Sequence, residues 1–309
     1  MIPHPEIAIV VVSYNTKSLL LECLASIIES AQKTAVEIIV VDNNSKDGSA
    51  EAVRESYPQL QIITNPVNVG FGAACNQAIK ASRSPFILLL NSDARLTPES
   101  LNILYESIAF DERCGAAGCR LIDDGGSEMV NTRNFLTSFN QALELTGMTK
   151  YFSSPHLSRT HRPDSRIDHP DCSVDWIDGA CMMLRRAALD EVGLFDEQFF
   201  MYSEDEDLCL RLRKHGWSIC YVARATAFHQ GGASSTNDRR ELLRHFYLSQ
   251  MLFLDKHRGH VSVRLYAAAM SAVIWLKRLL ASKRKPDMSD RLTALRAAYA
   301  SVLSQIQDK

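Results

Sequence analysis

Small polar and acidic side chains follow three apolar runs in the first third of the sequence. The three clusters are Ser13-Tyr14-Asn15, Asp42-Asn43-Asn44-Ser45 and Asn91-Ser92-Asp93. Any one of them is compatible with a structural role, because Asn, Asp and Ser form turns and cap helices. Three clusters at the same end of neighbouring strands would instead define one polar crevice. A carboxylate such as Asp93, directly after a buried strand, can hold Mg²⁺ or Mn²⁺, and the metal can bridge two phosphates.

No glycine-rich phosphate loop accompanies these clusters. The pattern G-x-x-x-x-G-K-[ST] does not occur, and no G-x-G-x-x-G follows the first apolar run. Gly70-Phe71-Gly72 opens a helical pattern but does not by itself indicate a phosphate site. A nucleotide diphosphate bound at this crevice would therefore need a metal at Asn91-Ser92-Asp93 to neutralise its charge.

A second acidic cluster stands at the start of a later helical pattern. It reads Ser203-Glu204-Asp205-Glu206-Asp207. Ser203 and Glu206 have the spacing of a capping box, and Asp207 can pair with Arg211 one turn further on. Neither role explains Asp205. This residue shares a helix face with three apolar residues, namely Leu208, Cys209 and Leu212. A carboxylate at the head of an apolar stripe faces the core or a pocket, where an idle charge is costly.

The elements that position the first three clusters are predicted from apolar periodicity. Four short, continuous apolar runs predict strands that are buried on both faces. They are Ile7–Val12, Glu37–Val41, Gln61–Thr64 and Phe86–Leu90. Apolar residues at helical spacing predict helices over Ser18–Ala31 and Phe71–Ser82. The alternation predicts an α/β fold with a parallel sheet that binds ligands at the carboxyl ends of its strands.

Further elements follow in the second half of the chain. Helices are predicted over Pro98–Asp111, in a short segment ending at Gly193 and over Glu204–His215, and strands over Gly115–Ile122 and Trp217–Ala223, with ordered structure at Gly179–Leu184. Tyr151–Asp171 is predicted to be a long loop, a form common among lids and substrate-specific elements. A domain boundary is expected near Gly231–Asn237, with a helical region beyond it.

Composition limits the classes of partner. The 309-residue chain is 46% hydrophobic and 23% charged with a formal net charge of -2, so no nucleic-acid partner is expected. From Arg239 to Lys285 basic residues outnumber acidic ones. Eight cysteines without C-x-x-C spacing, several within apolar runs, favour a reducing compartment. The N-terminus lacks the pattern of a secretory signal, and the sequence predicts a cytoplasmic protein.

The segment Val261–Ala281 combines apolar residues with basic flanks. The flanks are Arg258 on one side and Lys283-Arg284-Lys285 on the other. Only twelve uncharged residues separate Arg264 from Lys277, fewer than the roughly 20 that span a bilayer core. A basic-flanked helix with Trp275 suits a membrane interface. One hypothesis is therefore peripheral contact of residues 261–285 with the inner face of the plasma membrane; the other is an ordinary docking or dimerisation helix.

Six blocks of sequence resemble the family 2 glycosyltransferases with the GT-A fold, especially the rhamnosyltransferase-like branch. The blocks are VVVSYN, VVDNNSKDGS, N-x-G-F-G-A-A-C-N, LLLNSD, DGACMMLRR and FDEQFFMYSEDEDLCLRLRKHGW, followed by His229-Gln230-Gly231-Gly232. They occur in the order that the family uses and cover about residues 7–235. The resemblance implies a GT-A domain over residues 1–235, with a mostly parallel, helix-flanked sheet, and a helical C-terminal region over residues 236–309. Within the domain, residues 1–93 would form the nucleotide-sugar-binding half and residues 94–235 the acceptor half.

The resemblance also implies roles on the donor side. Residues that would contact or lie near the nucleotide are Ser13, Tyr14, Asn15, Asp42, Asn68, Gly70, Asn76 and Asn91. Asn91-Ser92-Asp93 corresponds to a metal-binding D-x-D motif whose first acid is replaced by Asn, which leaves Asp93 as the main ligand of Mg²⁺ or Mn²⁺. His229 matches a position that completes metal coordination in relatives, although a lone histidine is equally compatible with a structural role.

On the acceptor side, the resemblance assigns the general base to Asp205. Residues that would border the acceptor are Trp176, Gly179, Ala180 and Glu204, of which Trp176 suits the core equally well. A metal at Asp93 would neutralise the leaving diphosphate, and a carboxylate would take the proton of the attacking hydroxyl. One base opposite the leaving group gives a single displacement with inversion.

The implied reaction moves a sugar from a dTDP- or UDP-sugar, with dTDP-L-rhamnose as one candidate, to a glycan or lipid-linked acceptor in cell-surface polysaccharide synthesis. Two alternatives are weighed against it. A sugar nucleotidyltransferase would need a glycine- and arginine-rich loop after the first strand, where the sequence reads SYNTKSLL. An inactive scaffold with the same fold would not need Asp93 and Asp205.

Overall fold

The continuous apolar runs near the N-terminus form the parallel half of one large sheet. The computed structural model describes residues 5–146, 148, 160–161, 172–231, 239–280 and 286–307. The first strands are β1 (Ile7–Ser13), β2 (Val36–Asp42), β3 (Gln61–Thr64) and β4 (Phe86–Asn91). Strand β1 pairs in parallel with both β2 and β4, and β2 pairs in parallel with β3. The four predicted strands are therefore confirmed, but the prediction that all four are buried on both faces is wrong for β3, an edge strand whose Gln61 and Thr64 are exposed. Residues 7–11 are at most 1% exposed, because side chains on both faces of the sheet are covered.

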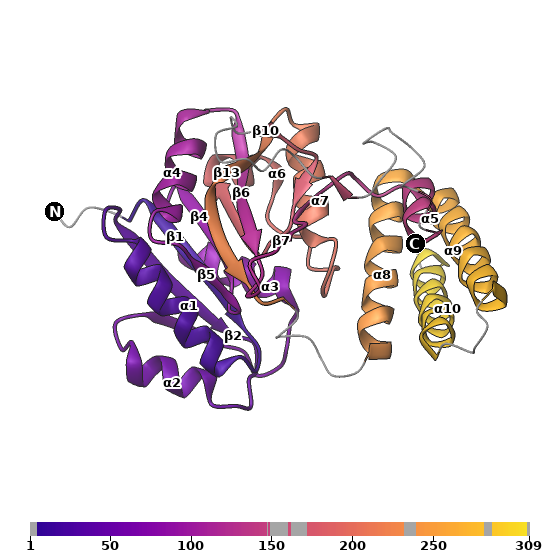
Figure 1. Cartoon of the computed structure of the whole chain (residues 1–309), viewed down its shortest axis with the longest axis horizontal. Helices are drawn as coiled ribbons and strands as arrows, with labels where there is room; N and C mark the ends of the chain where they lie inside the picture. The colour runs from indigo at the N-terminus through magenta and orange to yellow at the C-terminus, as the bar shows by residue number, and fades with distance from the viewer. Residues whose placement is uncertain are drawn as a thin grey trace. The chain divides into compact units, whose positions relative to one another are not determined.

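Helices cover the two faces of this sheet (Figure 1). They are α1 (Lys17–Ser30), α2 (Ser49–Ser56), α3 (Phe71–Ala81) and α4 (Ser100–Phe110). Helices α1 and α4 share a buried cluster with Ile7, Ile9 and Val11 of β1. Helix α3 packs on β1 and β2 through a different set of buried side chains, from Ala74 to Ile79. Because successive side chains of a strand point to opposite faces, the result is a three-layer α/β arrangement. Helix α2 was not among the predicted elements.

The chain after α4 adds further strands to this sheet and a second, small sheet that contains the pair Thr132–Arg133 and Trp176–Ile177. The elements are β6 (Cys114–Ile122), β7 (Glu128–Met129), β8 (Thr132–Arg133), β10 (Cys172–Ser173), β11 (Trp176–Ile177), β12 (Cys181–Arg185), α6 (Arg186–Val192), α7 (Glu204–Lys214) and β13 (Ser218–His229). The strand order is β10-β13-β6-β12-β4-β1-β2-β3. Strand β12 runs antiparallel between β4 and β6, whereas β6 and β13 are parallel. The predicted helix-flanked α/β sheet is thus confirmed, and β12 makes it a mixed one.

Strand β13 continues well beyond the predicted end at Ala223. Its register against β6 shifts between Val222 and Thr226, and its distal part pairs with the short strand β5 (Ala94–Leu96). In that pairing His229 lies opposite Ala94, the residue after Asp93. The sequence analysis missed β5, because a three-residue strand has no measurable periodicity.

The chain divides into two units, each discontinuous in sequence. Unit 1 comprises residues 1–133, 162–197 and 205–234, and unit 2 comprises residues 134–161, 198–204 and 235–309. Segments 134–161 and 198–204 therefore group with the C-terminal helices, whereas the sequence analysis assigned them to the first domain. The predicted boundary segment, Gly231–Asn237, lies outside the described residues except for Gly231 itself. The predicted loop Tyr151–Asp171 also lies outside them, apart from residues 160–161.

Unit 2 is mainly helical, which confirms the predicted C-terminal helices. Its elements are α5 (Ser138–Thr146), β9 (Thr160–His161), α8 (Arg239–Arg258), α9 (His260–Leu280) and α10 (Pro286–Gln307). The three long helices pack on one another through fully buried side chains such as Tyr247, Tyr266 and Ala298. Among the described residues, no helix is both long and apolar enough to span a membrane.

Candidate active site

The three polar clusters meet at one edge of the sheet. In the paired strands Ser13 lies opposite Asp42, and Val12 lies opposite Asn91. The Ser13 and Thr16 hydroxyls are 3.0 Å apart, and Thr16 donates to Ser92 Oγ at 2.8 Å. The ends of β1 and β4 are therefore joined by side-chain hydrogen bonds as well as by the ladder.

The turns after β1 and β2 hold each other in place. The Asn15 amide donates to Ser45 Oγ at 2.9 Å, and the Lys46 amide donates to Asn15 Oδ1 at 2.7 Å. Asn15 adopts a positive φ of 55°, a conformation that Asn tolerates better than most residues. Tyr14 is half-buried. The backbone around residues 13–15 and 42–46 is thus fixed before any ligand binds.

Asp42 carries an unsatisfied acceptor at the centre of this edge. The side chain is buried, and its Oδ2 accepts the Ser45 amide at 3.1 Å. Its Oδ1 is also buried, and no described residue donates a hydrogen bond to it. Leaving a buried carboxylate oxygen unpaired is costly, so this atom is suited to a donor group on a ligand.

Asn43 organises the loop that precedes α3, a role that the sequence analysis did not assign. Its Nδ2 donates to Asn68 Oδ1 at 2.8 Å and to the Gly70 carbonyl at 3.2 Å. Its Oδ1 accepts the Val69 amide at 3.0 Å and Asn65 Nδ2 at 3.1 Å. Gly70 has a φ of 89°, which favours glycine at this position. Asn68 and Gly70 thus lie beside the polar edge, fixed by a buried amide.

Asn76 does not join the polar edge in this way. It is buried in α3, and its Nδ2 donates to the Phe195 carbonyl and to Glu197 Oε1, both at 2.9 Å. Its Oδ1 accepts the Phe195 amide at 3.0 Å. The Asn76 side chain is therefore engaged in holding the segment after α6.

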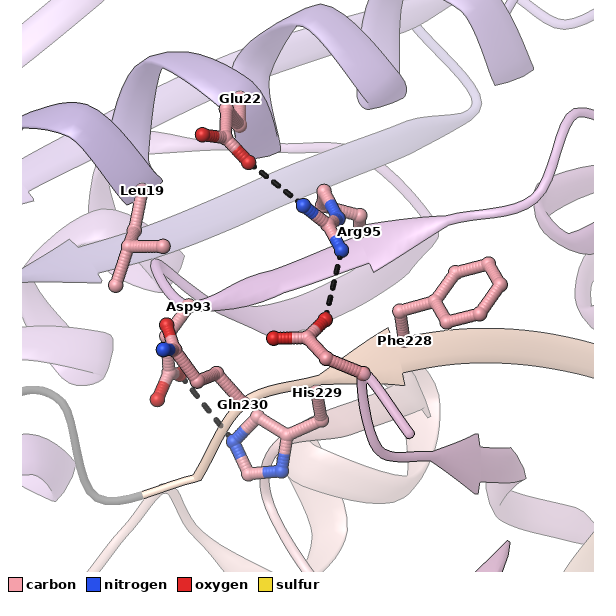
Figure 2. Close-up of a pocket in the computed structure, with 8 residues that line it drawn as sticks. Leu19, Glu22, Asp93, Arg95, Phe228, His229 and Gln230 are labelled. Atoms are coloured by element: carbon pink, nitrogen blue, oxygen red, sulfur yellow. Dashed lines mark hydrogen bonds and ion pairs between the residues drawn. The ribbon is translucent and has the colours of Figure 1, made fainter. Parts of the chain in front are cut away.

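Asp93 and His229 face each other beside a shallow pocket (Figure 2). His229 Nε2 lies 3.2 Å from Asp93 Oδ1 and 3.4 Å from Asn91 Nδ2. The two side chains are only 4% and 12% exposed. Other residues that line the pocket are Leu19, Glu22, Arg95, Asp124, Phe228 and Gln230. A carboxylate oxygen and an imidazole nitrogen that face each other are joined by a proton or by a cation, and this donor pair fits Mn²⁺ or Mg²⁺.

Asp205 is held by two backbone amides at the start of α7. Its Oδ2 accepts the Gly179 amide at 3.0 Å, and its Oδ1 accepts the Glu206 amide at 2.8 Å. The Glu206 amide, which a capping box would direct to Ser203, thus bonds Asp205. Burial, reinforced by the negative charge of Asp178, raises the pKa of Asp205 to about 7 although the two amides oppose the shift. A carboxyl group with that pKa can exchange a proton near neutral pH.

The segment before β12 connects Asp205 to the metal candidate. The Asn91 amide donates to the Ala180 carbonyl at 3.0 Å, two residues before Asp93. Next to Ala180, a Cβ on Gly179 would lie 3.1 Å from the Phe71 ring, so the close approach there favours glycine. Asp205, Gly179 and Ala180 thus belong to the same edge of the sheet as Asp93.

Two of the residues predicted to border the acceptor, Trp176 and Glu204, are buried. Trp176 is 5% exposed, and the Arg133 guanidinium lies over its ring at 5.8 Å, so its indole belongs to the packing beneath the edge. Glu204, the first residue of α7, is also 5% exposed. Asp207, about one turn further along the helix, is fully buried. It forms the expected ion pair with Arg211, in which Arg211 Nε lies 2.8 Å from Asp207 Oδ2.

Comparison with known proteins assigns the class. Residues 4–247 match the family described as "Glycosyltransferase like family 2". The chain belongs to this family and is a glycosyltransferase, which sets aside the nucleotidyltransferase alternative. The mannosyltransferase PcManGT from Pyrobaculum calidifontis, solved with GDP-Man and Mn²⁺, has a TM-score of 0.56 at 17% identity over 100% of this chain and 89% of its own. GalNAc-T7, solved with UDP, GalNAc and Mn²⁺, has a TM-score of 0.61 at 12% identity over 100% and 58%. These likenesses give the chain the GT-A fold.

The names of the relatives found by sequence are more specific than the name of the family. The N-acetylglucosaminyl-diphospho-decaprenol L-rhamnosyltransferase of Mycobacterium tuberculosis is 29% identical over 263 residues, which are 81% of this chain and 85% of that protein. Rhamnosyltransferase WbbL of Escherichia coli is 28% identical over 232 residues, which are 72% and 82% of the two chains. O-antigen biosynthesis protein RfbC of Myxococcus xanthus is 26% identical over 239 residues, 76% of this chain and 18% of RfbC.

The Asn43 network can be tested by Asn43→Ala. The change leaves the Val69 amide without its acceptor and removes one of the two donors to Asn68 Oδ1; a lost buried partner costs about 1–3 kcal/mol. We expect a lower free energy of unfolding in urea and faster amide hydrogen exchange over residues 65–70. The matched control is Asn44→Gly, which preserves the positive φ of 71° at Asn44 and removes only a bond to exposed Lys46. Equal exchange rates in the two variants would contradict this assignment.

Proposed function

We propose that this glycosyltransferase moves a sugar, with inversion, from a dTDP- or UDP-sugar to a lipid-linked acceptor in cell-surface polysaccharide synthesis. The proposal rests chiefly on one observation: the hydrogen bonds through Gly179, Ala180 and Asn91 that tie Asp205 to the edge carrying Asp93. Two of the relatives described above are rhamnosyltransferases, which supports dTDP-L-rhamnose as the donor. The name of the Mycobacterium tuberculosis protein includes a diphospho-decaprenol-linked sugar, which supports a polyprenol-linked acceptor.

The donor nucleotide lies across the ends of β1 and β2. The residues assigned to it are Ser13, Tyr14, Asn15, Asp42, Asn68, Gly70 and Asn91. The free Oδ1 of Asp42 accepts a hydrogen bond from the base or ribose, and the turns at Asn15 and Gly70 are already fixed by protein hydrogen bonds. A pre-formed pocket of this kind limits the ordering entropy that binding must overcome.

Asp93 and His229 would hold a divalent metal, Mn²⁺ or Mg²⁺. When bound, the metal supplies positive charge to the diphosphate leaving group without any proton transfer. Asp93 would contribute an oxygen and His229 its Nε2 nitrogen, which lies 3.2 Å from Asp93 Oδ1. The two side chains are nearly enclosed, so water would screen the attraction between the Asp93 carboxylate and a bound cation only in part.

Asp205 accepts the proton of the acceptor hydroxyl as that hydroxyl attacks the sugar. The Gly179 and Glu206 amides hold both carboxylate oxygens, so the side chain is oriented before the acceptor arrives. Glu204 borders the acceptor on the same helix. Because one base acts opposite the leaving group, the displacement is single and the anomeric configuration inverts.

The base assignment predicts a large loss of turnover in Asp205→Asn. Asparagine keeps the shape but cannot accept the proton, so kcat falls by about 10²–10⁴-fold with the donor Kd nearly unchanged. Turnover of the unchanged enzyme decreases as the pH falls below about 7, because protonated Asp205 is inactive. The measurement is the transfer rate at saturating donor and acceptor across pH. If Asp205→Asn retains more than about a tenth of turnover while Glu204→Gln is inactive, the base is Glu204.

The metal assignment predicts weaker Mn²⁺ binding in Asp93→Ala and His229→Ala. We expect the Kd for Mn²⁺ in the presence of dTDP or UDP to rise at least about tenfold, since losing even an outer partner of a ligand costs 10–100-fold. The signal of free Mn²⁺ in electron paramagnetic resonance gives this Kd without any activity measurement. Asp124→Asn is the control, because Asp124 lines the same pocket but binds Arg95 at 2.9 Å. Equal affinities in all four proteins would exclude the site.

Helix α9 supports contact with the membrane surface that carries such an acceptor. Its inner face is buried in unit 2 through Tyr266, Met270 and Ile274. Its outer face is also apolar, with five residues between 47% and 68% exposed, namely Val261, Leu265, Trp275, Leu276 and Leu279. Exposed Arg264 adds positive charge to this face. An exposed apolar strip with an aromatic residue and basic neighbours suits the lipid headgroup region.

The cysteines support the cytoplasmic side of the membrane. All eight are free thiols, as expected in a reducing compartment.

The membrane contact predicts that full-length protein co-sediments with vesicles of phosphatidylethanolamine and phosphatidylglycerol. The double variant Leu265→Glu, Leu279→Glu should bind at least about tenfold less, because burial of each leucine contributes about 1.5–3 kcal/mol. Phe110→Glu is the control, since Phe110 is 93% exposed but lies on α4 of unit 1. If the unchanged protein stays in the supernatant and elutes as a dimer that the double variant disrupts, α9 packs against a second copy of the chain.

A further inference from the structure

A second carboxylate, Asp178, lies next to the candidate base. It directly precedes Gly179, whose amide donates to Asp205 Oδ2 at 3.0 Å. Its own backbone amide donates to the Asn131 carbonyl at 2.9 Å, in continuation of the antiparallel pair formed by β8 and β11. The position of Asp178 is thus fixed from both sides, by the β8–β11 pair and by the hydrogen bond of the following residue.

Asp178 is paired with a cation from the neighbouring strand. Arg133 Nε lies 3.4 Å from Asp178 Oδ1, and the Arg133 guanidinium lies over the Trp176 ring at 5.8 Å. The side chains of Arg133 and Asp178 are 30% and 28% exposed, so water and salt screen their charges only in part. The ring and the backbone pairing hold the guanidinium where it partly offsets the charge of Asp178.

The charges that act on Asp205 come from two elements. Glu206 and the Cys209 thiol belong to α7 itself, whereas Asp178 belongs to the loop between β11 and β12. The Phe71 ring of α3 and Gly179 pack on the same side without charge. The pKa of Asp205 is raised first by burial and next by Asp178, ahead of Glu206. Asp178 is therefore the charged residue outside α7 through which neighbouring groups such as Arg133 can change the pKa of Asp205.

We propose that Asp178 and Arg133 are positioning residues for Asp205 and that the charges of this pair set the pH range of transfer. Asp178 disfavours the negative carboxylate beside it and keeps Asp205 a strong enough base to take the proton of a hydroxyl. Arg133 limits this effect and keeps Asp205 ionised near neutral pH. The inference rests on the proposed role of Asp205 as general base.

The two residues should act in opposite directions. Asp178→Asn removes a like charge, so the acidic limb of log(kcat/KM) against pH moves to lower pH, by at least about half a pH unit. Arg133→Gln removes the positive charge 3.4 Å from Asp178, so the limb moves to higher pH. Arg133→Lys keeps the positive charge and returns the limb towards that of the unchanged enzyme. Added salt reduces both displacements, because both side chains are partly exposed.

The experiment is a pH–rate profile of full-length protein at two salt concentrations, with KM and kcat separated and the unfolding temperature measured for each variant. Asp175→Asn is the matched control, an acid three residues earlier in the same segment whose charge is not among those that shift Asp205. Unmoved limbs, or limbs that move in the same direction in Asp178→Asn and Arg133→Gln, overturn the inference. Asp205→Asn is run alongside: if it transfers normally, the proposed base fails, whereas an inactive Asp205→Asn with unmoved limbs refutes the tuning pair alone.

Discussion

The antiparallel pairing of β12 with β4 is the constraint on which the site depends. Cys181 lies opposite Leu90, and the Asn91 amide continues the ladder to the Ala180 carbonyl. This register brings the segment before β12 to the polar edge where β1, β2 and β4 end. A slip by one residue would turn every side chain of β12 to the other face of the sheet and remove the Gly179 amide from Asp205. The buried core on both faces of these strands specifies the register. The packing of the sheet therefore also fixes the position of Asp205 relative to Asp93.

The first half of the fold could be predicted from the sequence because its signal is local. Each of β1–β4 is a continuous apolar run, and the polar clusters follow at the ends of the runs, so parallel pairing alone brings them to one edge. The proximity of His229 to Asp93 has a different origin. It follows from β5, a three-residue strand, and from a shift of register within β13. Neither leaves a periodic trace in the sequence, and only the resemblance to a family suggested that His229 belonged near a metal.

The individual roles of the asparagines could not be predicted from residue type. Asn43 and Asn44 are neighbours with the same side chain, yet Asn43 is 3% exposed and organises a loop, whereas Asn44 has a positive φ and bonds an exposed lysine. Asn76 was grouped with the nucleotide because it stands in a block shared with the family, but its amide fastens α3 to the backbone at Phe195. Which polar atoms face a ligand depends on burial and on competing partners, which appear only in three dimensions.

The free oxygen of Asp42 has a consequence for discrimination between bases. A buried acceptor to which no described residue donates attracts a ligand that offers N–H or O–H and repels one that presents a lone pair. The imide N–H of uracil and thymine meets that demand, whereas the corresponding ring nitrogen of cytosine carries a lone pair. Sites that require a hydrogen-bond donor reject analogues lacking it by about 10⁴–10⁵-fold, far more than a change in apolar contact achieves. In the proposed site, the single buried oxygen of Asp42 would therefore distinguish pyrimidine nucleotides by whether the base donates or accepts one hydrogen bond.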